Sequence, residues 1–198
     1  MNTDITVILF DLGRVLMHID FDAFPNALDL SSEDQRAPYR TATAKLTRVY
    51  ETGKITTEEF LEALYVLFES RYSKEKILEA WNSIIVEDNL EIIPLVKKIQ
   101  QQYVTAILSN TCESHWQKVI KISPLTRSFH HTFTSFHLGA MKPERIVYET
   151  VCTALSVQPR NVLFIDDLQE NVDGAISAGM KGILFSGVEK LTKELTNL

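Results

Sequence analysis

The sequence predicts an α/β fold in which a doubly wound parallel sheet carries a small all-helical insert after its first strand. Two observations predict the sheet: short runs rich in β-branched residues recur along the chain, and segments with helical spacing separate them. A third predicts the insert, because residues from about 18 to 88 contain helical stretches and no strand-like run. With 198 residues, 45% of them apolar and 23% charged, the composition is that of an ordinary globular protein.

Four apolar runs have the character of buried parallel strands. The first covers residues 5–10 (Ile-Thr-Val-Ile-Leu-Phe) and ends at Asp11 and Gly13. The other three are residues 104–108, 162–165 and 182–185. Helical spacing between these runs predicts helices over residues 90–102, 113–122, 144–156 and 168–179. Strands that alternate with helices imply right-handed crossovers and hence a parallel sheet.

The insert has its own helix-start signals. The segment Thr-Thr-Glu-Glu at residues 56–59 has a capping-box pattern, and Ser73 is suited to begin another helix. We therefore expect residues 1–17 and 90–198 to form the α/β core and residues 18–89 to form a helical cap domain. Hinges are expected near residues 16–20 and 86–92, so that the cap closes over the strand ends.

Charge and composition exclude several classes of protein. The 20 Lys and Arg against 26 Asp and Glu give a net charge of −6, and no long basic run is present, which argues against a nucleic-acid partner. No apolar window approaches the roughly 18 residues of a spanning helix, and Met1 to Asp4 lack a signal-like pattern, so we expect a cytoplasmic protein without a membrane partner. Cys112 and Cys152 form no metal-binding or disulfide motif and are expected to be reduced and buried.

Polar residues follow the predicted strands, where ligands bind in open α/β sheets. These are Asp11 after the first strand, Ser109 and Asn110 after the second, Asp166 and Asp167 after the third, and Lys142 before a helix. Each signal alone has an ordinary explanation as a turn, a helix start or a cap. Two adjacent carboxylates at a buried strand end are harder to explain, because they repel unless a cation or a donor is present. The conjunction of four signals at one sheet edge therefore indicates a site.

With the motifs FDLGRV, LSNT, MKPE and FIDDLQEN in this order, the sequence resembles the haloacid dehalogenase (HAD) superfamily of phosphatases over essentially its whole length. The resemblance implies a HAD-like Rossmannoid core and a cap of the small helical type. The DLG form of the first motif is similar to the bacterial branch close to α-D-glucose-1-phosphate phosphatase. The implied activity is Mg²⁺-dependent hydrolysis of a small phosphorylated metabolite, such as a sugar phosphate, by a monomer or homodimer.

The resemblance also implies a role for each motif residue. Asp11 is the expected nucleophile, which forms an aspartyl-phosphate intermediate. Lys142 supplies the positive charge that lets a dianionic phosphate approach this carboxylate. Ser109 and the backbone amide of Asn110 are expected to bind phosphate oxygens. The expected Mg²⁺ ligands are Asp11, the Gly13 backbone carbonyl, Asp167 and, through a bound water, Asp166.

Gly13 departs from the family pattern. Most phosphatases of the superfamily have a second Asp at this position, which protonates the leaving-group oxygen and later activates water. General acid–base help of this kind is worth about 10²–10⁴-fold. The branch close to glucose-1-phosphate phosphatase also has Gly here, so the change does not imply an inactive protein. A good leaving group, a metal-bound water or a nearby side chain would compensate, with Asp20 and His18 as the candidate side chains.

Two further residues have alternative interpretations. His115 lies on the helix after Ser109 and either lines the pocket or packs within the structure. Asn171, one helical turn beyond Asp167, either braces the carboxylates or lies on the helix surface.

Two other functional classes compete with the phosphatase. A metal-free dehalogenase would use the same Asp11 nucleophile on carbon, but it would leave Asp166 and Asp167 as unexplained buried charges. The other alternative is a noncatalytic relative that binds a metabolite or a protein, and the one observation that favours it is Gly13. A phosphomutase fits less well still, because return of the phosphoryl group to a hydroxyl relies on the acid and base that Gly13 lacks.

Overall fold

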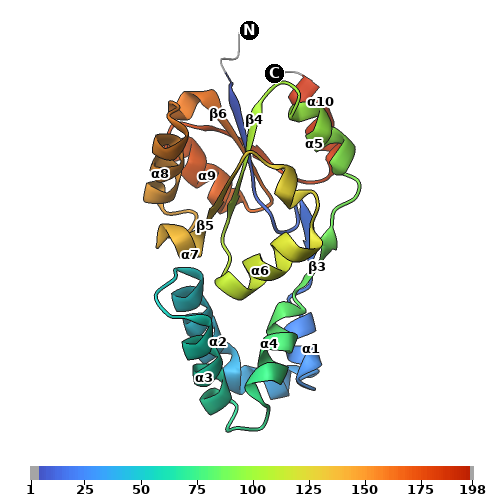
Figure 1. Ribbon diagram of the computed structural model, residues 1–198, viewed down its shortest axis with the longest axis vertical. Coiled ribbons are helices and arrows are strands. Elements are labelled where there is room, and N and C mark those ends of the chain that lie inside the picture. The colour runs from blue at the N-terminus through green and yellow to red at the C-terminus, as the bar shows by residue number, and fades with distance from the viewer. Residues whose placement is uncertain (1–4, 197–198) are drawn as a thin grey trace.

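A five-stranded parallel sheet forms the centre of the molecule. The computed structural model describes residues 5–196, so residues 1–4 and 197–198 of the expected core ranges lie outside the described residues. The strand order is β5-β4-β1-β6-β7, and all neighbours are parallel (Figure 1). The strands are β1 (Val7–Phe10), β4 (Val104–Ser109), β5 (His131–Thr134), β6 (Val162–Asp166) and β7 (Lys181–Leu184). This topology confirms the predicted doubly wound fold.

Helices cover both faces of the sheet, because alternate side chains of the buried strands point to opposite sides. Ile8 and Phe10 of β1 belong to one hydrophobic cluster, and Val7 and Leu9 belong to the other. The helices that pack on the first cluster are α5 (Ile93–Ile99), α6 (Glu113–Ile122) and α10 (Val188–Thr196). Those on the second are α8 (Arg145–Leu155) and α9 (Gln169–Ser177), on the opposite side of the sheet in Figure 1.

One strand of the sheet and two helices of the core were not predicted. Strand β5 reads His-Thr-Phe-Thr and lies at the edge of the sheet, where its first two residues are exposed. It lacks the apolar run on which the strand predictions depend. The two helices are α10 and the one-turn helix α7 (Ser135–Leu138). Strands β4 and β6 each extend one residue further than expected, so that Ser109 and Asp166 are the last residues of their strands.

The insert forms a separate helical layer beyond the carboxyl ends of the strands (Figure 1). We call its four helices, residues 23–82, the cap segment. They are α1 (Ala23–Ala27), α2 (Glu33–Glu51), α3 (Thr57–Leu67) and α4 (Lys74–Asn82). Side chains cap three of these helices. Thr56 forms a capping box and Ser73 accepts a hydrogen bond from the Lys76 amide, as the sequence predicts, and Ser32 forms a further capping box that was not predicted.

The expectation that residues 18–88 contain no strand was wrong at both ends of that range. Strand β2 (Met17–Ile19) pairs in antiparallel fashion with β3 (Ile85–Asp88), at the places where hinges were expected. Runs of three and four residues are too short to give a periodic signal. Between the core strands and helices lie a one-turn helix α7 (Ser135–Leu138) and two 3-10 turns, Thr126–Ser128 and Pro159–Asn161.

Helix α6 and its N-cap residue connect the cap segment to the core through packing and hydrogen bonds. Its N-cap residue, Cys112, is buried within the aromatic cluster of the cap segment, and the indole Nε1 of Trp81 donates a hydrogen bond to its Sγ at 3.3 Å. The Ser114 amide donates to the Tyr50 hydroxyl at 3.1 Å. The Lys118 ammonium donates to the carbonyls of Asn82 and Ile85 at 2.8 and 2.6 Å. These contacts hold the cap segment against the strand ends.

Two remaining sequence expectations concern cysteines and membranes. Cys112 and Cys152 are both free and buried, as expected. Within residues 5–196, none of the helices combines the length and the apolarity that crossing a membrane requires.

Candidate active site

The motif residues come together at the carboxyl edge of the sheet. Asp11 directly follows β1, and Ser109 and Asp166 end the two strands that flank it. Lys142 comes from the loop before α8 and reaches the same point. The sequence placed these residues at one edge, and the structure brings their side chains together.

Lys142 forms a buried ion triad with two carboxylates. Its Nζ lies 2.6 Å from Oδ1 of Asp11 and 2.7 Å from Oδ2 of Asp166. Asp166 is completely buried, and Lys142 is only 4% exposed. Burial lowers the pKa of Lys142, but the charges of Asp11 and Asp166 outweigh this effect and hold the pKa above its usual value. The lysine therefore remains protonated and fixed beside the Asp11 carboxylate.

Two asparagines hold this triad in place. The side chain of Asn110 accepts a hydrogen bond from the Lys142 amide at 2.9 Å and donates to the Lys142 carbonyl at 3.0 Å, next to a cis Lys142–Pro143 peptide bond. The Asn171 side chain donates to both oxygens of Asp166, at 3.0 and 3.1 Å, so it braces the carboxylate instead of facing solvent. The sequence predicted a role for the backbone amide of Asn110 alone, and its side-chain contact was not predicted.

The acidic groups at this edge can hold a divalent cation. One carboxylate oxygen from each of Asp11, Asp166 and Asp167 lies within 4.8 Å of the others. Three carboxylates and the Lys142 ammonium leave two net negative charges at a largely buried place. Such a charge excess around hard oxygen donors suits Mg²⁺. The exposed Arg14 side chain approaches Asp167 only to 3.8 Å, so it neutralises this carboxylate weakly compared with a bound metal ion.

The pKa values of the acids reflect this crowding. Burial raises the pKa of Asp11 to about 6; Lys142 opposes this shift and the neighbouring Asp166 adds to it. Burial and the Asp166 charge also raise the pKa of Asp167. A bound divalent cation would favour the ionised form of both groups.

A cavity of about 440 Å³ separates the sheet edge from the cap segment. Its floor includes Asp11, Gly13, Ser109, Asn110, Lys142 and Asp167. Asp166 is not part of the lining and lies behind Lys142. The cap segment contributes the opposite wall with Phe24, Thr47, Glu51 and Trp81. This volume is within the range that holds small-molecule ligands.

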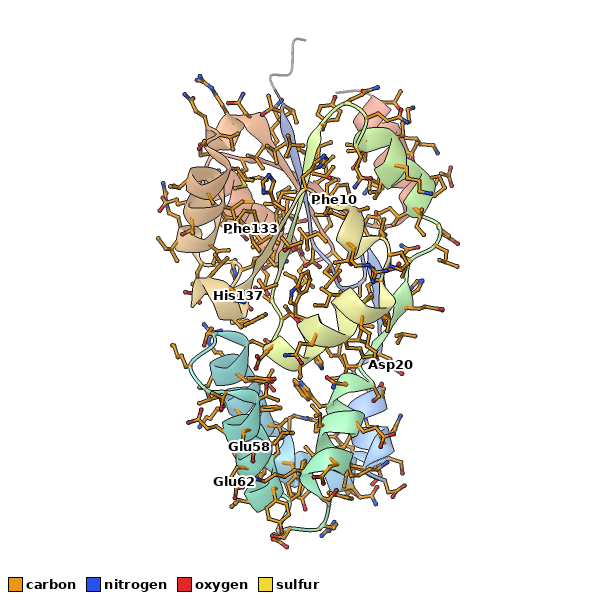
Figure 2. All side chains as sticks on the ribbon, in the orientation of Figure 1. Phe10, Asp20, Glu58, Glu62, Phe133 and His137 are labelled. Carbon is orange, nitrogen blue, oxygen red and sulfur yellow. The ribbon has the colours of Figure 1, made fainter. Side chains whose placement is uncertain are left out.

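The side chains expected to compensate for Gly13 do not reach this cavity. Both His18 and Asp20 are exposed and absent from its lining, and Asp20 lies at the margin between cap segment and core (Figure 2). His115 does line the cavity, where it stacks on Trp81 and donates a hydrogen bond from Nε2 to the Trp81 carbonyl at 2.9 Å. Burial lowers its pKa to about 4, so the imidazole is neutral near pH 7.

Glu51 is a cavity residue that was not predicted. It is the last residue of α2, its side chain is half-buried, and it lines the cavity opposite the sheet edge. Burial raises its pKa to about 7, although Arg48 on the same helix opposes the shift. The signal available in the sequence was an acidic residue in the last turn of a helix, where the helix dipole disfavours negative charge.

Comparisons with known proteins agree with this geometry. Residues 5–179 match the family model described as "haloacid dehalogenase-like hydrolase". The chain is 27% identical over 176 residues to D-ribitol-5-phosphate phosphatase of Bacteroides thetaiotaomicron, covering 83% of this chain and 84% of the relative. It is 25% identical over 202 residues to drimenol cyclase drtB of Aspergillus calidoustus, covering 98% of this chain but 36% of that longer protein.

Among solved structures, a wild-type HAD family enzyme of Bacteroides thetaiotaomicron, in complex with magnesium and inorganic phosphate, is similar with a TM-score of 0.80. The two sequences are 26% identical, and the alignment covers 92% of this chain and 94% of the other. The likeness therefore includes both the core and the cap segment.

Proposed function

This chain belongs to the haloacid dehalogenase-like hydrolases, and we propose that it is a Mg²⁺-dependent phosphatase of small phosphorylated metabolites such as sugar phosphates. One observation carries the proposal. The Asp11 carboxylate, exposed to a cavity of about 440 Å³, lies 2.6 Å from a buried ammonium and shares its edge with two more carboxylates. The similarity to D-ribitol-5-phosphate phosphatase, and to a structure that holds magnesium and phosphate, supports this choice.

These positions support the following mechanism. Asp11 attacks phosphorus in line with the leaving oxygen, and the bond from phosphorus to that oxygen breaks as the aspartyl-phosphate forms. Lys142 keeps the dianionic phosphate from being repelled by the nucleophile. The Ser109 hydroxyl and the backbone amide of Asn110 donate hydrogen bonds to phosphate oxygens. Water then attacks the aspartyl-phosphate and releases Asp11.

The cation site would consist of Asp11, Asp167 and the Gly13 backbone carbonyl, with Asp166 holding a metal-bound water. A Mg²⁺ ion bound there supplies charge neutralisation to the phosphate oxygens. The structure offers the donors that this ion prefers, since all three side chains are carboxylates. The same excess of negative charge disfavours a metal-free dehalogenase, which has no use for Asp167.

The test is phosphate release from a panel of sugar and polyol phosphates that includes α-glucose 1-phosphate and ribitol 5-phosphate. We expect release that requires both Mg²⁺ and Asp11, so Asp11→Asn is inactive and Asp173→Asn, an exposed change on α9, is fully active. Folded protein that binds Mg²⁺ and inorganic phosphate without turning over any panel member would instead favour a noncatalytic binding protein. Turnover of 2-haloacids without Mg²⁺ would favour a dehalogenase.

A further inference from the structure

In-line attack fixes where the leaving group departs. Asp11 stands on the floor of the cavity, so the oxygen opposite it on phosphorus points toward the cap segment. An alkoxide leaves slowly unless it is protonated as the bond breaks. Gly13 has no side chain to do this, and the methyl Cδ1 of Ile19 lies 3.0 Å from the place where a Cβ would stand. A side chain that protonates the leaving oxygen would therefore stand on the cap side.

The cap segment offers one ionisable side chain to this cavity within the described residues. Of the four cap-segment residues in the lining, Phe24, Thr47 and Trp81 have no titratable group, and the fourth is Glu51. No hydrogen bond to the Glu51 carboxylate is found in the part of the chain that the structure describes. This side chain is therefore free to contact a bound ligand.

The backbone around Glu51 is held firmly against the core. The neighbouring Tyr50 hydroxyl accepts the Ser114 amide at 3.1 Å. Gly53, with φ of 64°, packs so closely on α7 that a Cβ would lie 2.2 Å from the Phe136 carbonyl oxygen. The carboxyl group of Glu51 is thus held at the C-terminal end of a helix, where the helix dipole destabilises a negative charge. Residues that are locally unfavourable in this way are common at functional sites.

The other titratable groups of the cavity are unsuited to the task. Lys142 is committed to Asp11 and Asp166. His115 is neutral, and its Nε2 proton already goes to the Trp81 carbonyl. Arg14 approaches Asp167 at 3.8 Å, and the guanidinium group of an arginine does not serve as a proton donor or acceptor in acid–base steps. Asp11 and Asp167 belong to the proposed nucleophile and cation site.

We propose that Glu51 is the general acid and base of the reaction, acting from the cap segment in place of a side chain at position 13. This inference rests on the proposed phosphatase function. In the first step the Glu51 carboxyl gives its proton to the leaving oxygen as the phosphorus–oxygen bond breaks and Asp11 takes the phosphoryl group. In the second step the Glu51 carboxylate takes a proton from water as the water oxygen attacks phosphorus and Asp11 leaves. Both protons and both bonds balance over one turnover.

The environment of Glu51 supports this cycle. Its pKa of about 7 lets it hold the proton or release it near neutral pH. Arg48 is the charged group that opposes the shift. Burial raises the pKa of Cys112, the N-cap residue of α6, and the charge of Glu51 adds to this shift. The charged or titratable groups across the cavity are Asp11, Arg14, His115, Lys142 and Asp167. The helices packed on α2 add Glu58, Glu59 and Glu62 from α3 and His137 from α7.

The test compares two classes of substrate for Glu51→Gln, which keeps the size of the side chain but cannot give up a proton. Values of kcat/KM are measured with p-nitrophenyl phosphate, whose phenolate leaves unprotonated, and with a sugar phosphate turned over by the wild type. We expect a loss of about 10²–10⁴-fold for the sugar phosphate and little change for the aryl ester. Glu79→Gln, an exposed change on α4, is the matched control and keeps both activities.

A pH profile completes the test. In the wild type, kcat/KM for the sugar phosphate falls above about pH 7 as Glu51 loses its proton, and Glu51→Gln lacks this limb. Equal losses on both esters, no loss on either, or a rise in KM with unchanged kcat would each overturn the proposal. The proposed function is tested separately, because Asp11- and Mg²⁺-dependent hydrolysis of the aryl ester stands whether or not Glu51 acts.

Discussion

Glu51 should cost the protein stability at alkaline pH, and the cost can be worked out from its pKa. Burial raises that pKa from 4.5 to about 7, so between these values the folded state holds a proton that the unfolded chain has lost. The contribution of Glu51 to the free energy of unfolding is therefore fully present below pH 4.5 and is lost as the pH rises through 7. A shift of 2.5 units corresponds to about 3 kcal/mol. Solvent screens a half-buried carboxylate, so we expect about half of that.

The assay is chemical denaturation of the wild type and Glu51→Gln between pH 4.5 and 8.5, without Mg²⁺. The free energies of unfolding should agree near pH 4.5, and the variant should become more stable by about 1.5 kcal/mol at pH 8 and above. Other titrating groups, Asp11 included, cancel in this difference because both proteins contain them. Glu79→Gln should follow the wild type throughout.

A difference that is the same at pH 5 and at pH 8 would refute the reasoning. It would mean that the carboxyl group ionises in the folded protein as it does in the unfolded chain, so that burial at the cavity wall has no electrostatic cost. A less stable variant at pH 8 would likewise show that Glu51 gains more from its surroundings than burial removes.

Three further predictions test the candidate site and the contact between the cap segment and the core. Lys142→Met should abolish phosphate release and destabilise the protein by about 3–5 kcal/mol in chemical denaturation, because it leaves the Asp11 and Asp166 carboxylates buried without their partner. Mg²⁺ at a hundred times its Kd should raise the free energy of unfolding by about 2.7 kcal/mol, and Asp167→Asn should move this effect to higher Mg²⁺ in calorimetry. Gly53→Ala should lower the free energy of unfolding by more than 1 kcal/mol, whereas Gly139→Ala, with a similar φ but open space around it, should cost less.

The sequence predicted the part of the site that lies on the sheet. Buried parallel strands are apolar on both faces, so their ends are easy to find, and the topology of parallel strands then places those ends at one edge. Asp11, Ser109 and Asp166 could be brought together in this way without any knowledge of side-chain contacts. The weak points were the edge strand β5 and the short pair β2 and β3, whose few and partly polar residues carry no periodic signal.

The contacts that depend on three-dimensional packing were beyond the sequence. The Asn110 side chain holds the Lys142 peptide across 32 positions of the chain, and nothing local to either residue indicates this pair. The place of the cap segment over the sheet depends on Cys112, which is buried among aromatic residues of the cap. The sequence gives no sign of this contact. It therefore could not indicate that Glu51 faces the cavity and that His18 and Asp20 do not.

The candidate site is divided between the core and the cap segment, so the buried hydrogen bonds between these two parts are important for its geometry. The proposed nucleophile, Asp11, directly follows β1 at the carboxyl edge of the sheet, and the proposed acid, Glu51, stands on the last turn of a cap helix. An error of about 1 Å in their separation is enough to lose most of the benefit of proton transfer. The hydrogen bonds from Ser114 to Tyr50 and from Trp81 to Cys112, made in buried surroundings, set that separation. Substitutions at these contacts should therefore lower turnover of alkyl phosphates more than that of aryl phosphates, although none of these residues touches phosphate.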